Sequence, residues 1–156
     1  MTPKKVKKGD PVPDFSLPDQ HGKQINIRDF TGKRNLVLFF YPKDASPGCT
    51  KEACSFRNQL EAFNELDAEV MGISGQSVES HQKFARKYGL HYPLLSDEGD
   101  QVRKRFGVSS GLFGMLPGRV TYVIDKSGKV VHIFNSQFRV LQHVEDALEA
   151  LKEVSG

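Results

Sequence analysis

The sequence predicts an α/β fold in which a central mixed β-sheet is flanked by helices and preceded by an N-terminal β-hairpin. Short apolar runs typical of buried strands alternate with amphipathic, helix-like stretches along most of the chain. A strand hairpin over 119–134 and a C-terminal helix complete the pattern. No repeat or linker divides the sequence, so we expect one domain over residues 1–156, since domains commonly have about 100–150 residues.

The N-terminal third begins with an extended lead-in over residues 1–14, which is polar and contains three prolines. Two short apolar runs, Phe15–Leu17 and Ile25–Ile27, flank the segment DQHGK and predict a hairpin that turns at Gly22. Residues 29–35 then predict a turn or a single helical turn.

The most apolar run, LVLFFY over 36–41, has no polar alternation and predicts a central strand buried on both faces. The helix expected after it carries one apolar stripe, made of Ala53, Phe56, Leu60, Phe63 and Leu66. The remaining elements are expected as a strand at 70–74, a helix at 78–88 ended by Gly89, a strand at 94–95, a helix at 100–106, the 119–125/130–134 hairpin and a helix at 140–154.

The composition is that of an ordinary soluble protein, with 26% charged and 38% hydrophobic residues and a net charge of +3. No apolar run approaches the ~20 residues that span a bilayer, so we expect no membrane insertion. The first thirty residues contain no signal-peptide core, so we expect no secretion. Lysines 4, 5, 7 and 8 form a basic arm that we interpret as a solvated terminus, not a nucleic-acid contact.

Both cysteines lie in one stretch, YPKDASPGCTKEAC (41–54). Because they are only five positions apart, a bridge between them would close a tiny loop and add little stability. The spacing differs from the C-x-x-C of dithiol motifs, and no further cysteine pair or nearby histidine suggests zinc. The two side chains therefore serve either as buried apolar groups, as free cysteines often do, or as reactive thiols.

The predicted helix start favours the reactive thiol. Ser46 followed by Pro47 is typical of an N-cap and a first helical residue. Cys49 then lies in the first turn, where unpaired N–H groups and the helix dipole stabilise a thiolate. We expect Cys49, on the same face as Ala53, to point toward the sheet in a confined pocket, and Cys54 to lie about 140° around the helix.

The spacing also predicts a conformational switch. In an intact helix, residues five apart have Cα atoms roughly 8–9 Å apart, whereas a disulfide needs about 4.4–6.8 Å. A bond between Cys49 and Cys54 therefore requires the first turns of the helix to unwind.

The run from Pro42 through Ser46 to Cys49 resembles the peroxiredoxin active-site pattern P-x-x-x-[T/S]-x-x-C. The second cysteine in GCTKEAC is similar to the atypical two-cysteine group called peroxiredoxin Q or bacterioferritin comigratory protein. The blocks PDFSLPDQHGK, GISGQS, KYGLHYPLLSDEG and LFGMLPGRVTYVIDKSGKV also resemble that group, and LFGMLPGR is especially similar to plastid and cyanobacterial members. Ser46 stands where threonine is usual. The resemblance implies a thioredoxin-like fold.

The resemblance also implies residue roles. Cys49 would attack a hydroperoxide and become a sulfenic acid, which Cys54 would convert to an intramolecular disulfide. Arg119 would be the active-site arginine that stabilises the thiolate and polarises the peroxide. The Ser46 hydroxyl would bind the peroxide or cap the helix, and Pro42 would shield the thiolate from water.

The function implied is reduction of hydrogen peroxide and organic hydroperoxides, with recycling by thioredoxin, no bound cofactor or metal, and a monomeric state. The compartment would be a plastid if the chain is a processed mature form, and otherwise a bacterial cytoplasm. Two alternatives stay open: a thiol-disulfide oxidoreductase and a redox-switched binding protein that use the same disulfide. A Cys–His hydrolase is disfavoured, although one of the five scattered histidines could approach Cys49 in space. Phe113, Met115 and Leu116 are candidates for the pocket wall or for loop packing.

Overall fold

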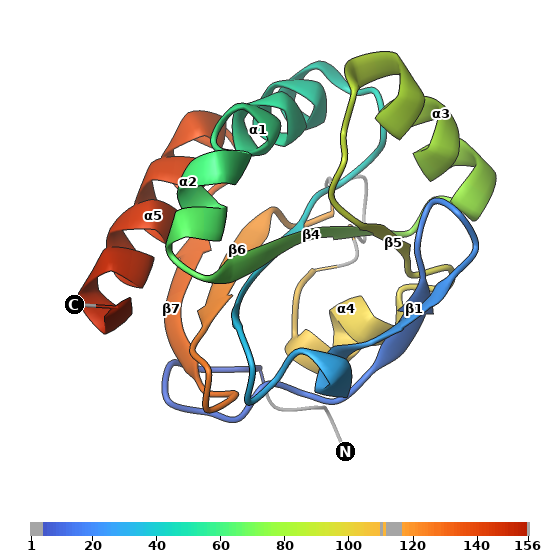
Figure 1. Cartoon of the computed structure of the whole chain (residues 1–156). Helices are drawn as coiled ribbons and strands as arrows, with labels where there is room; N and C mark the ends of the chain where they lie inside the picture. The colour runs from blue at the N-terminus through green and yellow to red at the C-terminus, as the bar shows by residue number, and fades with distance from the viewer. Residues whose placement is uncertain (1–4, 110, 112–116, 156) are drawn as a thin grey trace.

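The computed structural model describes residues 5–109, 111 and 117–155 (Figure 1). The strands are β1 (Ser16–Pro18), β2 (Gln24–Asn26), β3 (Asn35–Phe40), β4 (Ala68–Ser74), β5 (Leu94–Ser96), β6 (Val120–Ile124) and β7 (Val130–Asn135). The helices are α1 (Pro47–Asn58), α2 (Leu60–Glu65), α3 (Val78–Tyr88), α4 (Gln101–Phe106) and α5 (Val140–Ser155), with a 3₁₀ turn η1 (Ile27–Asp29). The predicted order of elements is confirmed.

Strand β3 lies at the centre of a five-stranded mixed sheet of order β5-β4-β3-β6-β7. It pairs in parallel with β4 and antiparallel with β6. All six of its residues are buried, as the unbroken apolar run predicted, because alternate side chains enter the cores on opposite faces of the sheet.

The helices divide between those two faces (Figure 1). Helices α1, α2, α3 and α5 pack on one face, where the core gathers around Phe39, Phe56, Phe63 and Phe84. Helix α4, the N-terminal segment and the β1–β2 hairpin cover the other face. This two-sided covering of a mixed sheet, with the separate hairpin, confirms the predicted fold class.

The hairpin turns where its sequence indicated. Gly22 has φ +78°, a conformation that favours glycine. The carboxylate of Asp19 accepts hydrogen bonds from the backbone N–H groups of His21 and Lys23 at 2.9 and 3.0 Å. The side chain of Gln20 then bonds the backbone beside β5, to the carbonyl of Tyr92 and the N–H of Leu94. The hairpin is thereby fixed to the edge of the sheet.

Two local expectations were imprecise. The single helix expected over the apolar stripe is interrupted at Gln59, whose backbone leaves the helical region at φ −104° and ψ 10°. The stripe continues across the break, since the rings of Phe56 and Phe63 still lie 5.6 Å apart. Ile27 begins the 3₁₀ turn and does not extend β2, because the Asn26 side chain accepts a hydrogen bond from the Arg28 N–H and starts the turn.

Among the described residues, no helix has the length and apolar character needed to cross a membrane.

Candidate active site

Cys49 lies in the first turn of α1, as predicted. Ser46 occupies the N-cap position with an extended backbone, and Pro47 is the first helical residue. The carbonyl of Ser46 accepts the first helical bond from Thr50 N at 2.8 Å. Cys49 is only 1% exposed and packs toward the sheet in the core that surrounds Phe39. Its thiol therefore sits at the positive end of the helix, shielded from bulk water.

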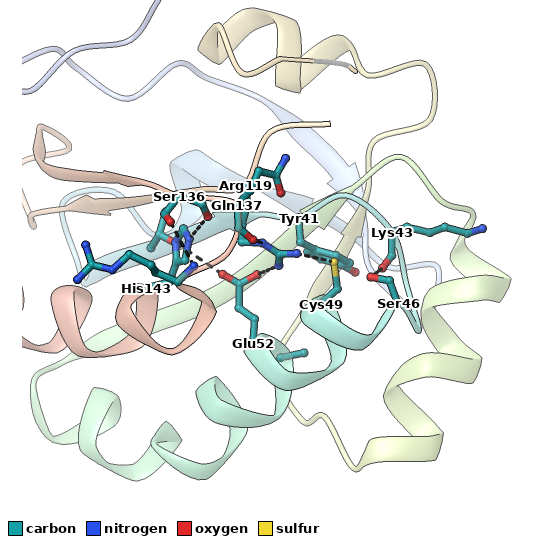
Figure 2. Close-up of polar contacts among 12 residues, drawn as sticks. Tyr41, Lys43, Ser46, Cys49, Glu52, Arg119, Ser136, Gln137 and His143 are labelled. Carbon is teal, nitrogen blue, oxygen red and sulfur yellow. Dashed lines mark hydrogen bonds and ion pairs between the residues drawn. The ribbon is translucent and has the colours of Figure 1, made fainter. Parts of the chain in front are cut away.

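Arg119 lies immediately before β6, the strand next to β3, and its side chain reaches the thiol (Figure 2). Its Nη2 lies 3.4 Å from the sulfur of Cys49, and its Nε donates to the carbonyl of Gln137 at 3.1 Å. A side chain at position 48 would crowd the guanidinium, since a Cβ added to Gly48 would lie 3.1 Å from Nη2. The arginine is 5% exposed, so its charge acts on the sulfur with little screening by solvent.

Glu52, one turn after Cys49, binds the same guanidinium. Its Oε1 accepts a hydrogen bond from Arg119 Nη1 at 2.7 Å, while its Oε2 lies 3.6 Å from His143 Nδ1 (Figure 2). Burial raises the pKa of Glu52 to about 7, although the charge of and hydrogen bond from Arg119 oppose that rise. Burial likewise lowers the pKa of His143 to about 4. Among the described residues, the thiol of Cys49 contacts Arg119, whereas the ring nitrogens of His143 contact Thr121 and Ser136. The thiol and this histidine are not paired directly, which argues against a Cys–His hydrolase.

The Ser46 hydroxyl does not cap the helix. It donates instead to the carbonyl of Lys43 at 3.0 Å (Figure 2). The cap expectation is therefore wrong for the side chain, although the position is right. The reason is geometric: the hydroxyl turns back toward its own loop, and its lone pairs remain available to a donor such as a hydroperoxide O–H. Pro42 is buried at the start of this loop and lines a cavity of about 180 Å³ together with Arg103 and Pro117.

Cys54 is partly buried on the flank of α1, and both cysteines are free. The helix between them is intact, so they are held apart by its geometry. A buried side chain from outside the helix also bonds this segment: the hydroxyl of Tyr92 donates to the carbonyl of Ala53 at 2.7 Å. The arrangement is that of a reduced dithiol, and a disulfide between the two thiols would require the helix to open.

The loop that leads into α1 is tied down by Asp44. Its carboxylate accepts hydrogen bonds from the Tyr41 hydroxyl at 2.6 Å, from the Ser80 hydroxyl at 2.8 Å and from His81 Nδ1 at 2.6 Å. The other ring nitrogen of His81 donates to the carbonyl of Leu95 at 3.1 Å. Helix α3 and strand β5 thus hold the loop that presents the thiol.

Arg103 supports the site from the opposite face of the sheet. It is 1% exposed, and its guanidinium donates to three backbone carbonyls of the described residues: those of Ser109, Gly118 and Tyr41, at 3.0, 2.7 and 2.8 Å. It therefore fixes both ends of the 109–118 segment and the residue before Pro42.

Sequence reasoning identified the two cysteines, Ser46, Pro42 and Arg119. The structure brings Cys49, Ser46 and Arg119 together at the start of α1, with Pro42 in the loop before it, and places Cys54 farther along the same helix. Sequence reasoning missed Glu52, although a carboxylate three residues after Cys49 on an otherwise apolar helix face is a signal of a buried partner. It also missed the residues that come from distant elements, namely Asp44, His81, Tyr92, Arg103 and His143. Phe113, Met115 and Leu116 lie outside the described residues. Within 5–109, 111 and 117–155, no cluster of three His, Cys, Asp or Glu side chains could hold a metal ion.

Comparisons with known proteins agree with this geometry. Residues 8–133 match the model of the AhpC/TSA family. Peroxiredoxin Q of Sedum lineare, described as chloroplastic, is 51% identical over 150 residues, which cover 96% of this chain and 80% of the relative. The chloroplastic peroxiredoxin Q of Arabidopsis thaliana is 53% identical over 148 residues, covering 95% and 68%.

Solved structures give the same result. Peroxidoxin BcpB from Mycobacterium tuberculosis superposes with a TM-score of 0.89 at 42% identity, covering 96% of this chain and 98% of that one. Bacterioferritin comigratory protein from Xanthomonas campestris, described for its alkyl peroxide reduction activity, gives 0.86 at 31% identity, covering 97% and 98%. The chain therefore belongs to the AhpC/TSA family, among its peroxiredoxins of the Q type, and is a thiol-dependent peroxidase.

Proposed function

We propose that Cys49 is the residue that attacks the peroxide and Cys54 the residue that resolves it. The thiolate of Cys49 attacks one oxygen of ROOH, the O–O bond breaks, and the sulfur keeps an OH group as a sulfenic acid. The leaving RO⁻ takes up one proton and departs as water or an alcohol. The Cys54 thiol then attacks the oxidised sulfur, and the OH group of the sulfenic acid leaves as water as the disulfide forms.

The observation that carries this proposal is the contact between Arg119 Nη2 and Cys49 Sγ at 3.4 Å, in a buried first helical turn. A fixed guanidinium and the helix N-terminus together favour the anionic sulfur. The same guanidinium would polarise the peroxide and stabilise the charge that develops on the leaving oxygen. Ser46, whose proton is donated to Lys43, would accept a hydrogen bond from the peroxide O–H, and Pro42 would exclude water from the thiolate.

Resolution within one chain follows from the placement of the two thiols. They lie on the same helix, so opening its first turns would bring Cys54 to Cys49 without any second subunit. We accordingly propose a single-domain monomer. A dithiol protein of the thioredoxin type would then reduce the disulfide, because the unwound segment presents it to solvent.

The cellular setting is also a proposal. Relatives described as chloroplastic match 95–96% of the chain, which favours a plastid over the bacterial cytoplasm.

The test is peroxide consumption coupled to thioredoxin and its reductase, with Cys49→Ser and Cys54→Ser variants. We expect no turnover without Cys49. Without Cys54 we expect one sulfenic acid per chain and poor recycling. Normal turnover by Cys49→Ser would refute the assignment. Rapid reduction of protein disulfides with slow peroxide consumption would instead favour an oxidoreductase, and slow rates in both assays a redox-switched binding protein.

A further inference from the structure

Arg119 is one buried cation that faces two acidic groups. Its Nη2 contacts the sulfur of Cys49 at 3.4 Å, and its Nη1 pairs with Glu52 Oε1 at 2.7 Å. The side chains of Arg119 and Glu52 are 6% and 0% exposed. If both acids were ionised, the cluster formed by Arg119, Cys49 and Glu52 would carry a net negative charge, which a low-dielectric site disfavours. One proton on either acid makes the cluster neutral. Arg103, a second buried cation near Cys49, is already coupled to the carboxylates of Asp97 and Asp100.

The second oxygen of Glu52 has an unusual environment. Oε2 is buried and has no hydrogen-bond partner among the described residues. Nδ1 of His143 lies 3.6 Å away. A buried carboxylate oxygen without a donor is costly, since it has lost water and gained nothing in exchange.

The hydrogen bonds of His143 determine where its own proton lies. Its Nε2 faces the carbonyl of Ser136 at 2.8 Å, and a carbonyl only accepts, so Nε2 carries the proton. Its Nδ1 then accepts from the Thr121 hydroxyl at 2.8 Å. The lowered pKa of this histidine agrees with a neutral ring. Glu52 Oε2 therefore faces an acceptor nitrogen and no donor, so an ionised Oε2 gains nothing from this contact, whereas a proton on Oε2 removes the repulsion.

The other groups near Glu52 do not supply that proton. Tyr92, beside β5, keeps its own proton, since burial raises its pKa well above the usual value and the charge of Glu52 raises it further. Its hydroxyl is already donated to Ala53. Arg119 donates to Oε1 and not to Oε2.

We propose that Cys49 and Glu52 share a single proton across Arg119, and that in the reduced enzyme this proton lies on Glu52 Oε2, facing His143 Nδ1. The inference rests on the proposed role of Cys49 as the thiolate. Glu52 and His143 are positioning residues here, because they act on the sulfur through Arg119.

The proton balance of the reaction follows from this arrangement. Before attack, the thiolate is the counter-ion of Arg119 and Glu52 is neutral. After attack, the sulfur is a neutral sulfenic acid, so Glu52 ionises and replaces it as the counter-ion. Glu52 releases one proton while the leaving RO⁻ takes one up, and the cluster is neutral throughout. When a reductant regenerates the Cys49 thiol, its proton returns to Glu52.

The test is infrared spectroscopy of the reduced protein, which detects the C=O stretch of a protonated carboxyl group directly. Subtracting the spectrum of Glu52→Gln identifies the band of Glu52, and Glu61→Gln on the exposed face of α2 is the matched control. We expect the band in reduced wild-type protein at neutral pH and in the Glu61→Gln control. In Cys49→Ser we expect the midpoint of its titration to fall by at least about one pH unit, because Arg119 is then free to pair with Glu52 alone.

A second comparison uses Cys54→Ser, in which the sulfenic acid forms without opening of α1. One equivalent of peroxide should abolish the Glu52 band. Absence of the band in the reduced wild-type protein, or an unchanged midpoint in Cys49→Ser, would overturn the proposal. The Cys49→Ser comparison leaves Glu52 in place, so it holds even if Glu52→Gln folds poorly. These spectra require no turnover, so their failure leaves the peroxidase assignment of Cys49 intact, whereas an active Cys49→Ser would refute that assignment itself.

Discussion

Asp44 and His81 form a buried ion pair, 2.6 Å between Oδ2 and Nδ1, that joins the loop before Cys49 to helix α3. The Asp44 carboxylate also accepts hydrogen bonds from the hydroxyls of Tyr41 and Ser80. Nε2 of His81 faces the carbonyl of Leu95 and so carries a proton, while Nδ1 faces the Asp44 carboxylate. We therefore expect the loop that presents the thiol to be held by two opposite charges enclosed in the fold.

We expect His81→Leu to lower the free energy of unfolding by about 3 kcal/mol, since it leaves the Asp44 charge buried without its partner. The double variant Asp44→Asn/His81→Leu should recover part of that loss, and Gln82→Leu, exposed on the same helix, should change little. Urea denaturation measures all three. A loss below about 1 kcal/mol for His81→Leu would contradict the ion pair, being the size expected for a neutral hydrogen bond.

Arg119→Gln should slow the reaction of reduced protein with hydrogen peroxide by roughly a hundredfold or more, because it removes the fixed charge from the thiolate and from the developing oxyanion. Stopped-flow measurement of the first oxidation step separates this effect from recycling. Arg139→Gln removes an exposed arginine at the start of α5 and serves as the matched control. Equal rates for the two variants would show that the 3.4 Å contact between Arg119 and Cys49 does not contribute to catalysis.

Tyr92→Phe should accelerate disulfide formation. The hydroxyl that it removes donates to the carbonyl of Ala53, within the segment that must open. Losing this bond lowers the cost of unwinding by about 1 kcal/mol, which corresponds to roughly a fivefold faster resolution step. Tyr88→Phe, on α3, is the control. The rate of sulfenic acid loss in single turnover measures the effect.

Hydrogen exchange should show directly that α1 opens on oxidation. We expect amides across residues 47–57 to be protected in the reduced protein and to exchange quickly in the disulfide form, because the intact helix holds the two Cα atoms beyond disulfide range. Equal protection in both redox states would rule out the switch.

In the reduced protein, the transient opening of α1 should depend on pH through the protonation of Glu52. Its pKa is raised to about 7 in the folded helix, against an ordinary value of 4.5, so the proton favours the closed form. That contribution is complete below pH 4.5 and is lost as the pH rises through about 7. It amounts to up to about 3 kcal/mol. Exchange in α1 should therefore increase between pH 5 and 8 in wild-type protein more than in Glu52→Gln, after correction for intrinsic exchange rates; parallel profiles would refute the linkage.

Much of the fold could be predicted from local sequence. The run at 36–41 has no polar residue on either alternate face, so only a strand covered on both sides can bury it. Gly89 after the 78–88 periodicity marked a helix end, and it adopts the left-handed conformation there. The interruption at Gln59 could not be predicted, because the apolar stripe runs through it unchanged.

The sequence by itself determined the chemistry of this protein. It placed Cys49 in a first helical turn, it set Cys54 too far along an intact helix to bond, and its motifs carry the likeness to the peroxiredoxins. These are properties of neighbours in the chain, which local backbone geometry controls. Only the tertiary structure decided which charges surround the thiol. Arg119 meets Cys49 across 70 positions, His81 meets Asp44 across 37, and Glu52 turns toward His143 because the packing of α1 against α5 encloses them together. Burial gives those contacts their energies, and burial is a property of the folded chain.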